Sequence, residues 1–199
     1  MSGTVFPIGH YGGTRAGADG ESVHAVRVGW QQYRLSEDAF TVWVLAHGTP
    51  EIGKGLLTVE DLLLQAAEIP DAGTQLEDLV TQGSLIVVPD QPEEATAFAK
   101  QHRMDVLFVG LGNAPDRPDG HAVGVPGLGA AAVLDPDCYE LWQWGSVAPT
   151  LWHSCEVRAA VTSELGREQG PIEALGEILG DLRYLLAHGC AYLDLADVG

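Results

Sequence analysis

Two widely separated segments of the chain end in nearly the same way. They read LEDLVTQGSLIVV (76–88) and LRYLLAHGCAYLDL (182–195). In each, apolar residues at helical spacing lead to a glycine, which is typical of the C-terminal end of a helix. The short apolar run that follows predicts a strand. A chain that repeats this helix–glycine–strand ending is expected to contain two related units.

The match continues upstream of the two endings. SVHAVRVGWQQYRLSEDAFTVWVLAHG (22–48) aligns with GHAVGVPGLGAAAVLDPDCYELWQWGS (120–146), and the matched pairs are His24 with His121, Leu35 with Leu134, Phe40 with Tyr139 and Trp43 with Trp142. We interpret this as a tandem duplication, and we expect the matched histidines to have a repeated structural role at the start of a strand.

Each copy is predicted to contain strands followed by three helices and a last strand. Ser36 and Asp135-Pro136 are typical N-terminal caps of the first helices, and Thr58 caps TVEDLLLQAA in the same way. The second helix of the second copy is expected in PTLWHSCEVRAAV. The third helices are expected at 71–82 and 173–188, and the last strands at 85–88 and 191–195.

A connecting helix and the domain limits complete the predicted organisation. PEEATAFAKQH (92–102) is expected to be a helix, and Val106–Val109 a strand that opens the second copy. The predicted parts are an N-terminal segment (1–21), copy one (22–90), the connecting helix (91–104) and copy two (105–199). The fold class is therefore α+β, a duplicated winged-helix-like domain with three strands and three helices per copy.

The composition is that of an acidic globular chain. Of its 199 residues 46% are apolar and 19% charged, and ten basic residues face 28 acidic ones, for a formal charge of −18. Such a charge repels phosphate backbones and anionic lipid. No secretory signal and no membrane-spanning run is recognisable. The cysteines Cys138, Cys155 and Cys190 are interpreted as reduced thiols, and a cytoplasmic location is expected.

The motifs resemble those of the PqqD-like fold, the recognition element of proteins that modify ribosomally made peptides. YRLSEDAFTVW, TVEDLLLQA and LEDLVTQGSLIV fit the three pieces of that family's pattern, whereas AVLDPDCYELW and LRYLLAHGCAYL fit only the first and third. The resemblance implies three strands followed by three helices. It also implies that a bound peptide adds as a strand beside the third strand and packs against the third helix.

Carried onto this chain, the resemblance places one peptide groove in each copy. In copy one its residues are Gln32, Tyr33, Arg34, Leu35, Leu76, Leu79 and Val80. In copy two they lie in 131–134, including Val133, and in the third helix at Ile178, Leu182 and Leu185. The same leucines also suit a helix core. The implied function is that of a non-catalytic peptide- or protein-binding scaffold, an accessory to peptide natural-product biosynthesis.

A winged-helix protein that acts in regulation or assembly through protein contacts, as a homodimer, is the alternative. Direct DNA binding is not expected, because the third helices are acidic and phosphate contacts need Lys or Arg. ELWQWGSVAPTLW is apolar on more than one side. It predicts either packing of the two copies against each other or a partner interface with Trp144 as anchor and Leu141 beside it.

An enzyme with an unrecognised site is a third hypothesis, less favoured than binding. VGLGNAPDRPDG (109–120) follows a strand, but it lacks a third glycine, and its prolines prevent an immediate helix, so a turn-rich loop is expected instead of a nucleotide site. No calcium-loop, zinc or triad spacing is recognisable. We therefore expect no catalytic residue, no metal and no cofactor.

Overall fold

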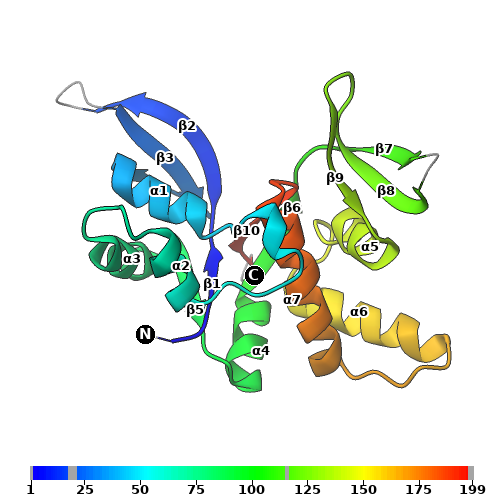
Figure 1. Ribbon diagram of the computed structural model, residues 1–199. Coiled ribbons are helices and arrows are strands. Elements are labelled where there is room, and N and C mark those ends of the chain that lie inside the picture. Colours follow the sequence, from blue (N-terminus) through cyan, green and yellow to red (C-terminus); the bar gives the residue numbers. More distant parts are fainter. Residues whose placement is uncertain (1, 18–21, 115–116, 197–199) are drawn as a thin grey trace.

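The computed structural model describes residues 2–17, 22–114 and 117–196 of the chain. Within these ranges the protein is mixed α+β, and its strands form four small antiparallel sheets (Figure 1). The predicted class, α+β, is confirmed at this level. No helix in the described ranges is long and apolar enough to cross a membrane.

The first half runs from Thr4 to Val88. Its strands are β1 (Thr4–Pro7), β2 (His10–Ala16), β3 (Ser22–Val28), β4 (Gln31–Leu35) and β5 (Leu85–Val88), and its helices are α1 (Glu37–Leu45), the short 3-10 helix η1 (Pro50–Ile52), α2 (Val59–Gln65) and α3 (Ala72–Thr81). Strands β2, β3 and β4 form one sheet in that order, and β1 pairs with β5 in a second sheet.

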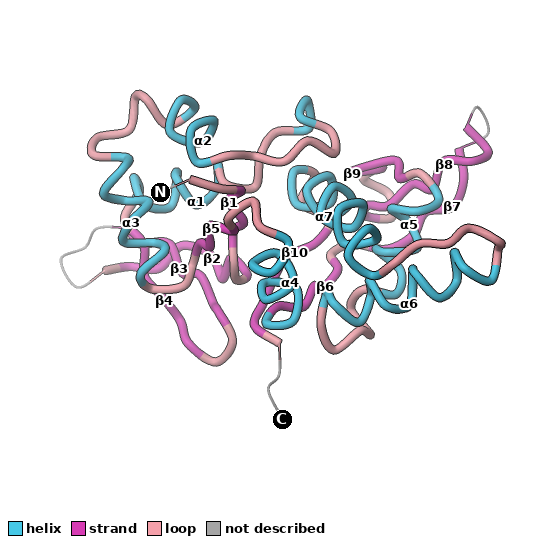
Figure 2. Tube along the Cα trace, turned by 90° about the horizontal axis from the view of Figure 1, so that it is seen from below, coloured by secondary structure: helices cyan, strands magenta, loops and turns pink. Residues whose placement is uncertain are grey.

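The second half runs from His102 to Leu195, after the connecting helix α4 (Pro92–Gln101). Its elements are β6 (His102–Val106), β7 (Val109–Ala114), β8 (Arg117–Val125), β9 (Gly129–Leu134), α5 (Pro136–Trp144), α6 (Leu151–Glu164), α7 (Pro171–Ala187) and β10 (Ala191–Leu195). Strands β7, β8 and β9 form a sheet in that order, and β6 pairs with β10. Figures 1 and 2 both place α4 between the two halves.

The helix ends predicted from the sequence are confirmed. The Ser36 side chain accepts a hydrogen bond from the Ala39 N–H, and Asp135 accepts one from Cys138. Thr58 and Asp61 form a reciprocal capping box. The third helices stop where expected, because Gly83 and Gly189 take positive φ angles of 83° and 62° that few other residues adopt.

Three strand predictions are corrected. Strands β1 and β2 lie in the segment that the sequence left outside copy one, so each half has five strands instead of three. The predicted strand at 106–109 is split between β6 and β7, because Phe108 takes a φ of 73° that breaks the extended backbone. The segment 109–120 was predicted to be a loop, but β7 pairs there with the start of β8.

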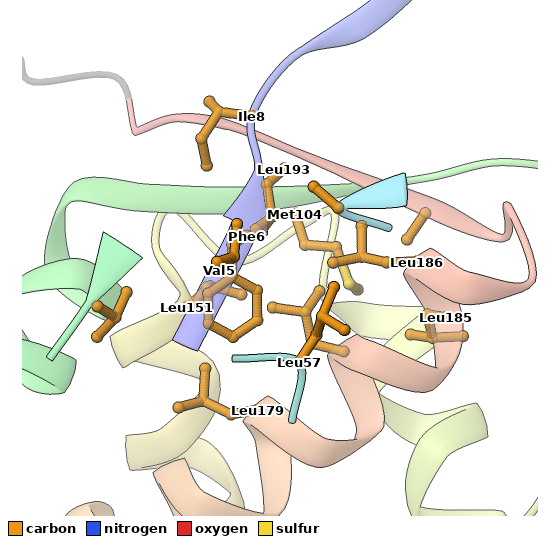
Figure 3. Close-up of a cluster of buried hydrophobic side chains, with 14 of the residues drawn as sticks. Val5, Phe6, Ile8, Leu57, Met104, Leu151, Leu179, Leu185, Leu186 and Leu193 are labelled. Carbon is orange, nitrogen blue, oxygen red and sulfur yellow. The ribbon is translucent and has the colours of Figure 1, made fainter. Parts of the chain in front are cut away.

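The two halves share one hydrophobic core. Val5 and Phe6 of β1 lie beside Met104 of β6, Leu193 of β10 and the leucines of α7 (Figure 3), and all of these side chains are buried in one continuous cluster. Apolar burial is the main favourable term in folding. We therefore expect the halves to fold as one cooperative unit.

Polar contacts also join the halves, and their side chains include residues of α7 and β10. Arg183 of α7 donates to the carbonyl of Ala46, and Arg27 of β3 donates to Asp194 of β10 at 2.8 Å. Helix α1 packs on α3, and α5 packs on α7, each within its own half. Each first helix therefore packs mainly within its own half, and the Ala46 cap of α1 takes part in the contact with α7.

His47, after the end of α1, makes the fold sensitive to acid. Burial lowers the pKa of His47 from 6.5 to about 4, and the Arg183 charge acts in the same direction. The unfolded chain therefore binds a proton that the native state excludes, so stability present above pH 6.5 is lost as the pH falls toward 4. Between pH 7 and 5 we expect His47→Gln to lose about 2 kcal/mol less unfolding free energy than the parent chain, measured by urea titration. Equal losses in the two proteins would contradict this assignment.

Candidate peptide-binding site

Strand β4 is an edge strand, and the turn before it determines which of its backbone groups are free. Gly29, with a φ of 54°, and Trp30 form a two-residue turn between Val28 and Gln31. Glycine in the first position is typical of a type II′ hairpin. In such a hairpin the flanking pair, Val28 and Gln31, exchanges both backbone hydrogen bonds.

The bonding pattern alternates along β4. Because bonded and non-bonded pairs alternate in an antiparallel ladder, Tyr33 and Leu35 also direct their N–H and C=O groups toward β3. Gln32 and Arg34 then direct theirs to the open side of the sheet. No hydrogen bond to these outward backbone groups is found from any other described residue. The first half therefore presents two free donors and two free acceptors along an exposed edge.

The structure divides the predicted peptide-binding residues into exposed and buried groups. Gln32 and Arg34 are exposed, and Tyr33, Val80 and Val133 are partly buried. The buried members are Leu35, Leu76, Leu79, Ile178, Leu182 and Leu185. A partner could contact these leucines only after the core had opened, so the accessible part of the predicted site is the edge of β4.

The corresponding edge in the second half is partly occupied. Leu134 pairs with His121 as Leu35 pairs with His24, so Val133 corresponds to Arg34, and its backbone groups face outward. The Tyr184 hydroxyl of α7 donates to the Val133 carbonyl at 3.3 Å. One acceptor of the β9 edge is therefore already used, whereas the matching acceptor of β4 is free.

The predicted interface residues Trp144 and Leu141 lie in one hollow. A cavity of about 250 Å³ between α5 and α6 is lined by both residues and by Val147 and Val157. Trp144 is 59% exposed, whereas Leu141 is buried. The structure thus brings this predicted pair together, with the tryptophan at the mouth of an apolar hollow.

The matched histidines have structural contacts. His24 stacks on Phe40 at 3.9 Å between ring centroids, and His121 stacks on Tyr139 at 4.2 Å, each beside the last residue of an edge strand. Both ring nitrogens of His24 are used: Nδ1 lies 3.1 Å from the Tyr11 hydroxyl and Nε2 lies 2.8 Å from Glu37. The repeated structural role is therefore seen in the stacking, but His121 lies in the middle of β8 and not at a strand start.

The three cysteines are free and buried. Burial raises the pKa of all three thiols, to about 12 for Cys155 and about 11 for Cys190. A thiol reacts through its thiolate, so these side chains are poor nucleophiles at neutral pH. In the described part of the chain, no group of three or more His, Cys, Asp or Glu residues gathers in a way that could hold a metal ion.

The third helices offer little to a nucleic acid. Glu77 and Asp78 are exposed on α3, and the basic residue of α7, Arg183, is fully buried. Without accessible cations these helices cannot release counterions from phosphates, which is the main source of DNA affinity.

Two arginines in the same sheet as β4 were not singled out from the sequence. Arg15 lies on β2, in the segment left outside copy one, and Arg27 lies on β3. The period of two along β3 and β4 places Arg27 and Arg34 on the same face, and this spacing is a signal that the sequence does contain. Comparison with known proteins adds no further assignment: no family model matches the chain, and neither does any curated protein or solved structure.

Proposed function

We propose that this chain is a non-catalytic peptide- or protein-binding protein that holds an extended segment by strand addition at β4. The observation that carries the proposal is the free edge, at which the backbone groups of Gln32 and Arg34 face outward. Backbone hydrogen bonds give affinity in strand addition, and neighbouring side chains give specificity. The Arg34 carbonyl of β4 is free, whereas the matching Val133 carbonyl of β9 accepts from Tyr184, so the first half is the favoured binding site.

The proposal includes a tandem duplication of a winged-helix-like unit. Equivalent contacts recur in the two halves: Trp43 Nε1 donates to the Ile8 carbonyl and Trp142 Nε1 to the Leu107 carbonyl, while the Ile8 N–H donates to Ser84 and the Leu107 N–H to Cys190. Duplication explains these contacts more simply than independent origin. It also supports the resemblance to PqqD-like recognition elements and, with it, an accessory role in peptide natural-product biosynthesis.

A proline at Gln32 tests strand addition. The neighbouring residue Tyr33 is unsuitable for this substitution because its N–H faces β3. The Gln32 N–H faces outward, and proline is tolerated at such edge positions. Decapeptides selected from a displayed random library on the immobilised full chain should bind Gln32→Pro at least about tenfold more weakly by fluorescence polarisation.

The control for this test is Val133→Pro, because it alters an outward position of β9 whose carbonyl is already bonded. It should leave peptide affinity unchanged, and both variants should keep the parent helical circular dichroism. Selected peptides that bind Gln32→Pro as tightly as the parent would refute strand addition at β4.

The hollow beside Trp144 supports a second candidate function, a protein interface that includes a homodimer. Tryptophan is enriched among residues that dominate binding energy, and here it lies at the mouth of an apolar cavity. Partner binding that survives Gln32→Pro and is lost in Trp144→Ala would favour this candidate.

A further inference from the structure

The outer face of the first sheet carries three of the four basic residues of the first half. Before residue 90 the basic residues are Arg15, Arg27, Arg34 and Lys54. His24 and Val26 point toward the core, so Arg27 points to the opposite, outer face. The register pairs Arg15 with Val23 and Arg34 with Ala25, which places all three arginines on that face.

One of these arginines already binds an acidic strand of the protein itself. Asp194 of β10 accepts hydrogen bonds from Arg27 Nη1 at 2.8 Å and from the Gly29 N–H at 2.6 Å. Beside it, the Gly9 N–H donates to the backbone carbonyl of Leu193 at 2.7 Å. One arginine of the outer face thus already holds a carboxylate of a neighbouring strand, with backbone hydrogen bonds from Gly9 and Gly29 beside it.

Arg34 lies diagonally across from Arg27, at a typical distance of about 7–8 Å between such positions. It is exposed, and no described carboxylate lies within ion-pairing distance of its guanidinium. It is also one of the two residues whose backbone faces the open edge. A strand added to β4 would place its own outer-face side chains directly beside Arg34.

The same face in the second half lacks such charges. With His24 matched to His121 and Leu35 to Leu134, the positions of Arg27 and Arg34 are taken by Gly124 of β8 and Val133 of β9. The fold of such a sheet therefore does not require arginine at these positions. Three arginines on one face of a single small sheet stand out in a chain with a formal charge of −18.

We infer that the segment captured at β4 is acidic and places an Asp or Glu carboxylate against Arg34. This inference rests on the proposed strand addition and adds the chemical class of the partner. Arg15 and Arg27 lie farther from the added strand, and Arg27 is already paired with Asp194, so Arg34 is the arginine that the captured segment would meet. Charge-assisted hydrogen bonds of this kind are stronger than neutral ones, so the acidic position should dominate side-chain selectivity.

Peptide selection on the full chain tests the inference. Decapeptides enriched from the displayed random library should carry Asp or Glu at a fixed position. Binding of a synthetic enriched peptide should weaken about tenfold in Arg34→Gln and when that acid is changed to its amide. Arg117→Gln, which alters an exposed arginine of the second sheet, should leave the affinity unchanged.

The outcomes separate the two proposals. Neutral or basic enriched peptides, or peptides that bind Arg34→Gln as tightly as the parent, would overturn the acidic partner. If these peptides still bound Gln32→Pro more weakly, strand addition at β4 would stand. If no enriched peptide is sensitive to Gln32→Pro, strand addition at β4 fails, and the acidic partner fails with it.

Discussion

Arg183→Met should lower the free energy of unfolding by about 3 kcal/mol at pH 7, because two core carbonyls would lose a charged donor. Arg183 is fully buried in α7, and its guanidinium donates to the carbonyls of Ala46 and Val5 in the first half. It also lies over the Phe6 ring, 4.7 Å from the centroid. Methionine fills similar space but donates no hydrogen bond.

The sign of this effect depends on two opposing terms. Burial lowers the pKa of Arg183 to about 10, which shows that desolvation of the charge is unfavourable. Against this, the cation lies at the C-terminal end of α1, where the helix dipole is negative. Each charged hydrogen bond contributes about 1.5–3 kcal/mol, so two of them outweigh the relief that methionine brings.

Urea titration of the full chain measures the difference. Arg167→Met, which alters an exposed arginine after α6, is the matched control and should change stability by less than about 0.5 kcal/mol. An Arg183→Met variant as stable as the parent would show that the buried cation does not stabilise the contact between the halves.

Local signals account for the parts of the fold that could be predicted. The caps at Ser36, Thr58 and Asp135 and the glycines at the ends of the third helices act within a few residues, so the sequence shows them directly. Strand β2 was missed because Gly12 and Gly13 interrupt its alternation, and the register with β3 shifts there. Its pairing partner, rather than its own sequence, makes it a strand.

The contacts between the halves could not be predicted from the sequence. Arg183 aligns with Glu77 in the duplicated ending, yet the glutamate is exposed and the arginine is buried against the first half. At the candidate site, Gln32–Leu35 were predicted as a group, but the outward residues were not separated from those that face β3. They follow from the turn at Gly29-Trp30, and a glycine-first two-residue turn could have identified Gln32 and Arg34.

A second large effect is expected at Asp181, a buried carboxylate that joins the halves from α7. Its Oδ1 lies 2.6 Å from Lys54 Nζ of the first half, and its Oδ2 accepts from Arg158 Nη1 at 2.8 Å. Gly180 makes room for the approach, because a Cβ there would lie 3.2 Å from the Lys54 carbonyl. Burial alone would lower the pKa of Lys54, but hydrogen bonds to Asp135 and Asp181 raise it above its usual value.

Asp181→Asn should therefore destabilise the chain by about 3–5 kcal/mol, since it keeps the shape but leaves two cations around a neutral amide. The control is Asp137→Asn: Arg158 uses only the backbone carbonyl of Asp137, so stability should stay within about 0.5 kcal/mol of the parent.

The shape of the urea transition of Asp181→Asn tests whether the two halves unfold together. Because the ion pairs and the core both span the halves, the weakened chain should still unfold in one transition, seen identically by tryptophan fluorescence and circular dichroism. Two separated transitions in Asp181→Asn would mean that the halves are independent units and that the shared core does not couple them.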